Sequence, residues 1–179
     1  ERSYVRRSID TDDGLPDTQV NAIAQTRDGY LWIGARRGVA RYDGLAFRLF
    51  SPDDAPELPA GQVNGLRVDR EGRLWIATSR GLVVREDGAM RRIPHDQVPD
   101  RAVWDVLHDS QGRLWIAGDG GLHVGDGTRF THVAGTDSLY LYSLTEDATG
   151  RLWMAGRGVL ASIGPGDSVP IVARRDAGD

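Results

Sequence analysis

The chain has 179 residues and a formal net charge of −4, with 22 lysine and arginine side chains against 26 aspartate and glutamate side chains. It is long enough for one well-buried domain, and its arginines are spread along the sequence, which argues against nucleic acid as the main partner. The lack of cysteine excludes a disulfide framework and a thiolate metal site. No apolar run reaches the roughly 20 residues of a membrane-spanning helix.

In chain order, the first predicted elements are a leading strand over Ser3–Ile9 and a turn at 13–16. Four periods follow, and each contains four short apolar runs separated by Gly, Asp and Pro. In the first period these runs are 19–26, 30–35, 39–42 and 47–50. Periods of about 40 residues built from helices would show apolar residues every three or four positions over long windows, and no such pattern appears. Four short strands per unit are typical of a propeller blade.

The sequence therefore predicts an all-β fold, a β-propeller segment of four four-stranded antiparallel blades that is part of a larger ring. The segment fills the chain, 1–179, with blades over residues 18–50, 61–93, 101–133 and 139–173. Propellers usually close when a strand from one terminus completes the blade of the other. Here the fourth period carries its own fourth strand, so the leading strand is spare. We expect a partial ring whose two end faces pair with a second copy or with further blades.

The stretch Asp109-Ser110-Gln111-Gly112-Arg113-Leu114-Trp115-Ile116-Ala117 shows the repeat most clearly. It returns around Trp32, Trp75 and Trp153, at intervals of 38 to 43 residues. Its Asp accepts a hydrogen bond from the backbone N–H two residues on, and its Gly takes the positive φ that ends such a hairpin. The first period has Thr26 in place of the Asp. Because Leu-Trp-Ile has no alternating polar residue, this strand is expected to lie buried between two blades, with its Trp in the core.

The first period carries the resemblance to a known family. Its segments 13–16, Val20-Asn21, 28–34 and 38–44, followed by Phe47, resemble the two-component regulator propeller repeat, and the later periods are similar. In that family the repeats build periplasmic sensor propellers, usually fused through a membrane helix to a histidine kinase or a diguanylate cyclase. The resemblance therefore implies the extracytoplasmic, periplasmic part of an inner-membrane receptor. The repeat favours Thr at a position that only Thr78 matches, the other periods having Ala35, Gly118 and Gly156.

Candidate binding residues lie on the rim that carries the loops between the second and third strands. These loops supply Arg36, Arg37, Arg80, Asp119 and Arg157. The starts of the first strands add four residues, each eleven positions before a repeat Trp: Asn21, Asn64, Trp104 and Tyr142. Arginine with Trp and Tyr at a concave rim suits carboxylates, sugars or phosphates, through bidentate hydrogen bonds and stacking. The alternative is that these arginines only solubilise the rim.

The predicted function is non-catalytic ligand sensing by the extracytoplasmic propeller of a bacterial signal-transduction receptor. The expected ligand is a small molecule or an oligosaccharide, and no cofactor, metal or nucleic acid is expected. The four histidines lack short metal-ligand spacing, and no nucleophile elbow, phosphate loop or paired-carboxylate motif appears. Two alternatives stay open: a propeller lyase or glycan hydrolase that uses the arginine-rich rim, and a protein-interaction scaffold.

Overall fold

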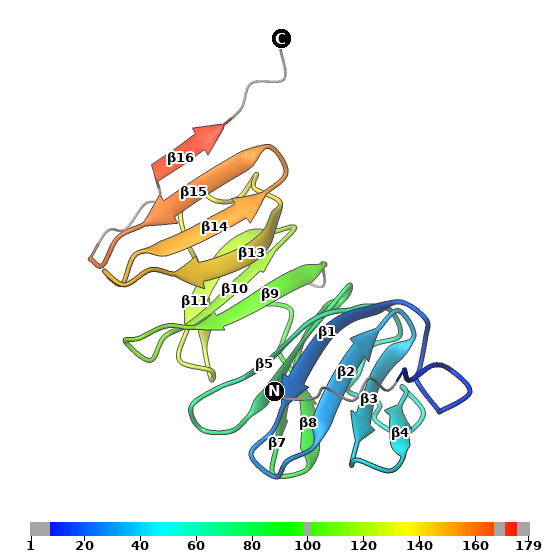
Figure 1. Cartoon of the computed structure of the whole chain (residues 1–179). Helices are drawn as coiled ribbons and strands as arrows, with labels where there is room; N and C mark the ends of the chain where they lie inside the picture. The colour runs from blue at the N-terminus through cyan, green and yellow to red at the C-terminus, as the bar shows by residue number, and fades with distance from the viewer. Residues whose placement is uncertain (1–7, 99–100, 167–170, 175–179) are drawn as a thin grey trace, which may run out of the picture.

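The computed structural model describes residues 8–98, 101–166 and 171–174. Within these ranges the chain forms sixteen β-strands in four separate sheets. Each sheet takes four consecutive strands in chain order, and every pairing in it is antiparallel. Each sheet is therefore a four-stranded propeller blade, and the all-β prediction is confirmed (Figure 1).

The strands of each blade follow the repeat. Blade 1 contains β1 (Val20–Gln25), β2 (Leu31–Ala35), β3 (Gly38–Tyr42) and β4 (Phe47–Phe50). Blade 2 contains β5 (Val63–Val68), β6 (Leu74–Thr78), β7 (Gly81–Glu86) and β8 (Ala89–Arg92). Blade 3 contains β9 (Val103–His108), β10 (Leu114–Gly118), β11 (Gly121–Gly125) and β12 (Phe130–His132). Blade 4 contains β13 (Leu141–Glu146), β14 (Leu152–Gly156), β15 (Val159–Ile163) and β16 (Ile171–Arg174). The predicted leading strand, Ser3–Ile9, lies largely outside the described residues, and its last two, Ser8 and Ile9, are not in a strand.

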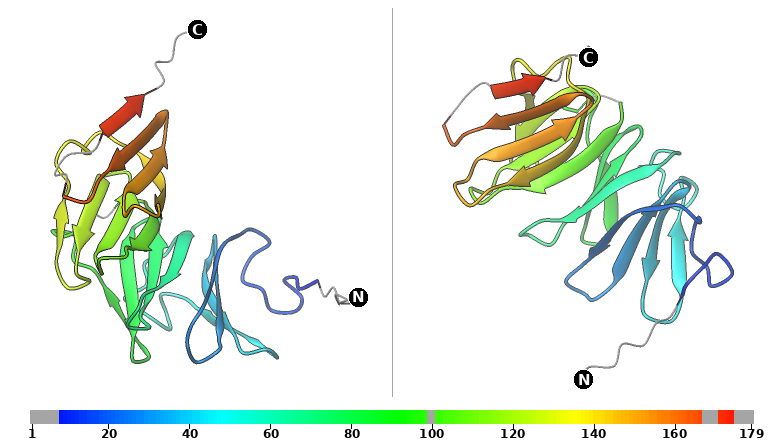
Figure 2. Two further views of the ribbon diagram at one scale, coloured as in Figure 1. Left: turned by 60° about the vertical axis from the view of Figure 1, so that its left-hand side comes forward. Right: turned by 45° about the horizontal axis from the view of Figure 1, so that its top comes forward.

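The four blades follow one another along an open arc, with blade 1 and blade 4 at its ends (Figures 1 and 2). The first strands of neighbouring blades lie next to each other: β1 against β5, β5 against β9, and β9 against β13. This approach is close, because a Cβ built on Gly65 of β5 would stand 2.8 Å from the backbone oxygen of Trp104 in β9. The described residues therefore form part of a propeller ring, not a closed one.

The core consists of three apolar clusters, one between each pair of neighbouring blades. In the middle cluster, the Trp75 side of blade 2 packs against the Ile116 side of blade 3. The strands β6 and β10 are buried along their whole length, as expected for strands covered on both faces. The repeat tryptophans Trp32, Trp75 and Trp115 are at most 3% exposed, which confirms them as core residues. The prediction is wrong for the fourth, Trp153, which is 37% exposed because no described blade covers its side of blade 4.

The hairpin turn after each first strand explains the fixed Asp and Gly. Gly112 has a φ of +84°, and its N–H donates to the Asp109 carbonyl. The Asp109 carboxylate accepts from the backbone N–H of Gln111 at 2.9 Å, as predicted. It also accepts from Trp115 Nε1 at 2.8 Å, a bond that the spacing alone did not reveal. The Asp of the turn therefore holds the repeat Trp in place through its indole N–H.

Candidate ligand-binding rim

Four of the predicted residues occupy one and the same structural position. In blade 1, Val20 pairs with Ala35 and Ala22 pairs with Gly34, so Asn21 is an extra residue in β1. The same register shift leaves one extra residue in each of the other first strands: Asn64, Trp104 and Tyr142. A β-bulge leaves its residue outside the ladder and re-aims the side chain. The constant spacing before each repeat Trp thus marks a bulge.

The two asparagines hold neighbouring blades together. Asn21 Nδ2 in blade 1 donates to the Val63 carbonyl of blade 2 at 2.9 Å. Asn64 Nδ2 in blade 2 donates to the Val103 carbonyl of blade 3 at 2.7 Å. Asn64 Oδ1 is buried and has no hydrogen-bond partner within the described part of the chain. The asparagine N–H groups at the first two junctions therefore act between blades.

At the third junction the asparagine is replaced by an aromatic cluster. Trp104 Nε1 donates to Asp119 Oδ1 at 2.8 Å, which links the bulge of blade 3 to its loop between β10 and β11. The Tyr142 ring of blade 4 stands edge-on to Trp104, with ring centroids 5.3 Å apart and planes at 76°. Tyr142 is 40% exposed. We call Trp104, Asp119 and Tyr142 the rim cluster.

Beside the rim cluster lies a second aromatic contact. The Arg157 guanidinium sits 4.9 Å from the centre of the Tyr140 ring, within the range of a cation–π interaction. The Arg157 N–H also donates to the Tyr140 carbonyl at 2.9 Å. Tyr140 was missed from sequence, although its alternation with Tyr142 across Leu141 is a signal that could have found it. The rim of blade 4 thus presents two tyrosines and an arginine.

Arg36 and Arg37 lie apart, at the other end of the arc. With Thr11, Pro16, Asp17 and Thr18 they line an open cavity of about 340 Å³. Arg37 Nε stands 3.9 Å from Asp17 Oδ2. A hydrogen bond from the Gln19 N–H, together with the charges of Arg36 and Arg37, lowers the pKa of Asp17. These arginines could hold an anion, but one of them already faces a carboxylate.

Arg80 has no described contact with the rim cluster or with the cavity lined by Arg36 and Arg37. It is exposed, its N–H donates to Thr78 Oγ1 at 3.1 Å, and its carbonyl accepts from Arg92 Nη2 at 2.7 Å. The structure therefore divides the nine predicted residues. It gathers Trp104, Asp119 and Tyr142, pairs Arg36 with Arg37, and gives the asparagines a role between blades.

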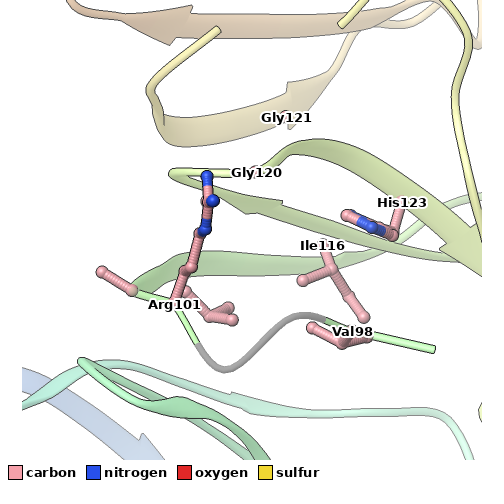
Figure 3. Close-up of a pocket in the computed structure, with 9 residues that line it drawn as sticks. Val98, Arg101, Ile116, Gly120, Gly121 and His123 are labelled. Atoms are coloured by element: carbon pink, nitrogen blue, oxygen red, sulfur yellow. The ribbon is translucent and has the colours of Figure 1, made fainter. Parts of the chain in front are cut away.

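A small cavity beside blade 3 is not a ligand site. It lies between Val98, Ile116 and His123 on one side and Arg101 on the other, with the Arg101 side chain reaching toward Gly120 (Figure 3). Its volume is about 10 Å³, roughly the space of one water molecule. Burial, with a contribution from His132, lowers the pKa of His123 to about 4. This histidine is therefore a neutral core residue at pH 7.

Two further features bear on ligands and membranes. Nowhere in the described ranges do three or more His, Cys, Asp or Glu side chains come together in an arrangement that could hold a metal ion. Among the same residues, no helix is long and apolar enough to cross a membrane.

The architecture and rim define the chain as a β-propeller segment. The repeats of blades 1 to 3 are two-component regulator propeller repeats, because the family model of that description matches residues 14–37, 57–80 and 97–120. Each matched stretch contains the first two strands of a blade and the loop that follows them. The family resemblance seen in the sequence is confirmed.

Solved structures share the fold. The extracellular domain of the hybrid two-component system BT3049 from B. thetaiotaomicron superposes with a TM-score of 0.79 at 21% identity, over 96% of this chain and 26% of that one. The corresponding domain of BT4673 from the same organism gives 0.74 at 18% identity, over 90% of this chain and 23% of that one. Virginiamycin B lyase from Staphylococcus aureus gives 0.67 at 13% identity, over 92% of this chain and 58% of that one. This chain thus spans about a quarter of the first two structures. A comparison with curated protein sequences found no match.

Proposed function

We propose that this chain is the sensing propeller of a bacterial signal-transduction receptor, that it works in the periplasm, and that it binds its ligand without chemical turnover. The family of its repeats supports the sensor role. Two proteins of similar fold are extracellular domains of hybrid two-component systems, which favours a place outside the cytoplasm. In this proposal an output domain elsewhere in the full-length protein carries the enzymatic activity.

The observation that carries the proposal is the rim cluster. Its aromatic rings are held by defined contacts, and Trp104 and Tyr142 come from two different blades. Within the described residues, Asp119 Oδ2 accepts no hydrogen bond, so one carboxylate oxygen is available to a ligand hydroxyl or amine. An aromatic surface beside a hydrogen-bond acceptor suits a small molecule or oligosaccharide with one apolar face and one hydroxylated edge.

The rim cluster also offers a route from binding to signalling. Tyr142 belongs to blade 4, whereas Trp104 and Asp119 belong to blade 3. A ligand that touches both sides favours the arrangement of the two blades in which these groups stand closest. A ligand can shift a conformational equilibrium only by its difference in affinity for the two states, and contacts across a junction between blades supply such a difference.

Tryptophan fluorescence and thermal-shift titrations with neutral oligosaccharides, uronates and small carboxylates test the proposal. We expect at least one class to bind, and Tyr142→Ala and Asp119→Ala to weaken that binding by 10-fold or more. Arg129→Ala, an exposed change on the opposite rim of blade 3, is the matched control and should leave binding unchanged. Equal binding by all three variants would place the ligand elsewhere.

The lyase alternative has its own readout. The likeness to virginiamycin B lyase is one of fold, at 13% identity. If the purified chain turned over lactones, glycosides or polyuronates, and Arg80→Ala abolished this turnover, the enzyme reading would replace the sensor reading.

A further inference from the structure

A cavity of about 290 Å³ opens at the outer edge of the junction between blades 1 and 2. Three segments line it: Arg48 and Phe50 of β4, residues 54–57 of the connection between the blades, and residues 88–90 at the turn into β8. Phe50 lies on the face of blade 1 that packs against blade 2, so the cavity belongs to an internal junction. Its volume is close to the lower end of the usual range for small-molecule pockets, about 300 to 1,000 Å³.

The sequence explains why this junction is open where the next one is filled. At the junction of blades 2 and 3, Arg73 reaches the outer turn of blade 3, since a Cβ built on Gly127 would lie 2.7 Å from Arg73 Nη2. Tyr30 stands at the equivalent position in blade 1, two residues before the repeat Trp, and Arg41 covers its ring at 4.0 Å. Gly88 is the equivalent of Gly127, and no described atom lies within 4 Å of the place where its Cβ would be. The space that an arginine fills at one junction is therefore open at the other.

A second difference between the blades enlarges the same space. Phe130 of blade 3 stands edge-on to Trp75 of blade 2, with ring centroids 5.9 Å apart, and it is 4% exposed. In blade 2 the residue at this register position is Met90, which pairs with Arg85 as Phe130 pairs with Gly125. Met90 is only partly buried. Its unbranched, flexible side chain is slimmer than a phenyl ring, so it forms an adaptable apolar wall.

The lining combines apolar atoms with one cation. The apolar side chains are Phe50, Ala55, Pro56 and Met90. The Arg48 guanidinium lies 4.9 Å from the centre of the Phe50 ring, and no carboxylate of the described residues forms an ion pair with it. Arginine presents a planar fork of donors that matches a carboxylate. Arg48 is therefore available to an anionic group of a ligand that also touches the Phe50 ring.

Two carboxylates on the connection between the blades supply the opposite charge. Asp54 Oδ2 accepts from Ser51 Oγ at 2.9 Å, and Glu57 Oε2 accepts from the Arg92 N–H at 3.4 Å. Their other oxygens, Oδ1 and Oε1, accept no hydrogen bond from any described residue. Leu58, next to Glu57, is 1% exposed and belongs to the core cluster between the two blades. The connection is thus anchored, and its free carboxylate oxygens are in place before a ligand arrives.

We propose that this cavity binds a free α-amino acid with a large apolar side chain. Arg48 pairs with the carboxylate of the ligand, and Asp54 and Glu57 accept hydrogen bonds from its ammonium group. The apolar side chain of the ligand packs on Phe50 and Met90. A ligand with a single charge would satisfy only one side of the cavity, whereas an amino acid satisfies both. The cavity is separate from the rim cluster, so this inference does not rest on the proposed sensing function.

Isothermal titration calorimetry of the 179-residue chain with L-phenylalanine and L-leucine tests the proposal. We expect binding with a dissociation constant of about 1 mM or tighter. Two analogues of L-phenylalanine each lack one charge: 3-phenylpropionate has no ammonium group, and phenethylamine has no carboxylate. Each analogue should bind about 10-fold more weakly or worse, because one charged side of the cavity is then left without its partner.

Three variants connect the binding to this cavity. Arg48→Ala should weaken binding of L-phenylalanine by about 10-fold or more and abolish the preference for it over phenethylamine. Met90→Phe introduces the ring that blade 3 has at this position and should weaken binding by occupying the space. Arg91→Ala is the matched control. Arg91 is exposed and follows Met90 in β8, so its side chain points to the opposite face of the sheet and binding should be unchanged.

Three results would overturn the inference. One is the absence of binding by either amino acid up to about 10 mM. Another is equal binding by Arg48→Ala, Met90→Phe and the unchanged chain. The third is loss of amino-acid binding in Tyr142→Ala, since this result would place the ligand at the rim cluster and leave the proposed function intact. Circular dichroism of each variant shows whether its blades are still folded, so loss of binding is separable from loss of the fold.

Discussion

Replacing Asp109 with alanine removes four hydrogen bonds from one buried carboxylate. Oδ2 accepts from Trp115 Nε1 at 2.8 Å and from Arg113 Nε at 2.6 Å. Oδ1 accepts from the backbone N–H groups of Gln111 and Arg113, at 2.9 and 2.8 Å. Asp109 is 1% exposed and Trp115 is 3% exposed. The alanine variant therefore leaves the Trp115 N–H buried without its acceptor.

The expected loss is about 3 kcal/mol of unfolding free energy. A buried donor left unsatisfied costs about 1 to 3 kcal/mol, and each lost turn bond costs roughly 0.5 to 1.5 kcal/mol. The Arg113 guanidinium is partly exposed and can turn to water, which limits its share of the loss. Burial alone would raise the pKa of Asp109, but hydrogen bonds from Trp115 and Arg113 outweigh it and lower the pKa. The stabilisation is therefore present above about pH 4 and is lost as the pH falls through the lowered pKa.

Urea denaturation followed by circular dichroism measures this loss, and the chain contains two matched controls. Asp147→Ala breaks the same Trp bond in blade 4, where Trp153 is 37% exposed and its N–H can reach water, so the midpoint should fall by less. Asp109→Thr copies blade 1, in which Thr26 Oγ1 accepts from Trp32 Nε1 at 3.0 Å, and should keep part of the stability. A midpoint shift for Asp109→Ala no larger than that for Asp147→Ala would refute the reasoning.

Three more predictions concern packing, pH and the contacts between blades. Trp75→Ala removes a fully buried side chain from the junction of blades 2 and 3 and should cost about 3 to 5 kcal/mol in a denaturant titration, against little change for exposed Arg91→Ala. Burial lowers the pKa of the His123 imidazole to about 4, so the unfolded chain binds a proton at this histidine before the folded chain does as the pH falls. Stability should therefore fall between about pH 6.5 and 4. His123→Leu should flatten that part of a stability-against-pH curve, and an unchanged slope would contradict the assignment. Between blades, Asp105 Oδ2 accepts from the Leu144 N–H at 2.9 Å, and Arg67 donates to the Val106 carbonyl at 3.1 Å. Because the Arg67 side chain is half-exposed and Asp105 is more buried, Asp105→Ala should lower the urea midpoint more than Arg67→Ala. The reverse order would be the refuting result.

The sequence predicted what one repeat determines by itself. The tryptophan spacing gave four blades, and the Asp-to-Gly spacing gave a turn with a positive φ at Gly112. It did not predict what two neighbouring blades determine together. The amide of Asn21 bonds to a carbonyl 42 residues away, and such a partner is set by how sheets stack. Trp153 reads like its three equivalents in sequence, yet it is exposed because no described blade covers it.

The same difference explains the departure from the family pattern at the end of the second strand of blade 3. The repeat favours Thr there, and Thr78 shows why. Its buried Oγ1 donates to the Gly81 carbonyl at 2.8 Å and accepts from the Arg80 N–H at 3.1 Å. Blade 3 has Gly118 at the equivalent position. A Cβ at Gly118 would lie 2.5 Å from the Ala102 carbonyl oxygen, which the Asp119 N–H holds in place at 2.9 Å.

A consensus argument predicts that Gly118→Thr stabilises the blade, whereas the structure predicts the opposite. The new side chain would push against a fixed carbonyl, and overpacking of this kind costs about 1 to 3 kcal/mol. The reciprocal change, Thr78→Gly, should also destabilise, by about 2 kcal/mol, because it removes two buried hydrogen bonds and adds backbone entropy to the unfolded chain. Both substitutions should therefore lower the urea midpoint, although one moves toward the family pattern and the other away from it. Since Asp119 follows Gly118 and binds Trp104 at 2.8 Å, Gly118→Thr should also change the fluorescence of Trp104, measured against a Trp104→Phe background. A higher midpoint for Gly118→Thr would show that the connection before β9 yields, and that the approach of Ala102 does not fix the glycine.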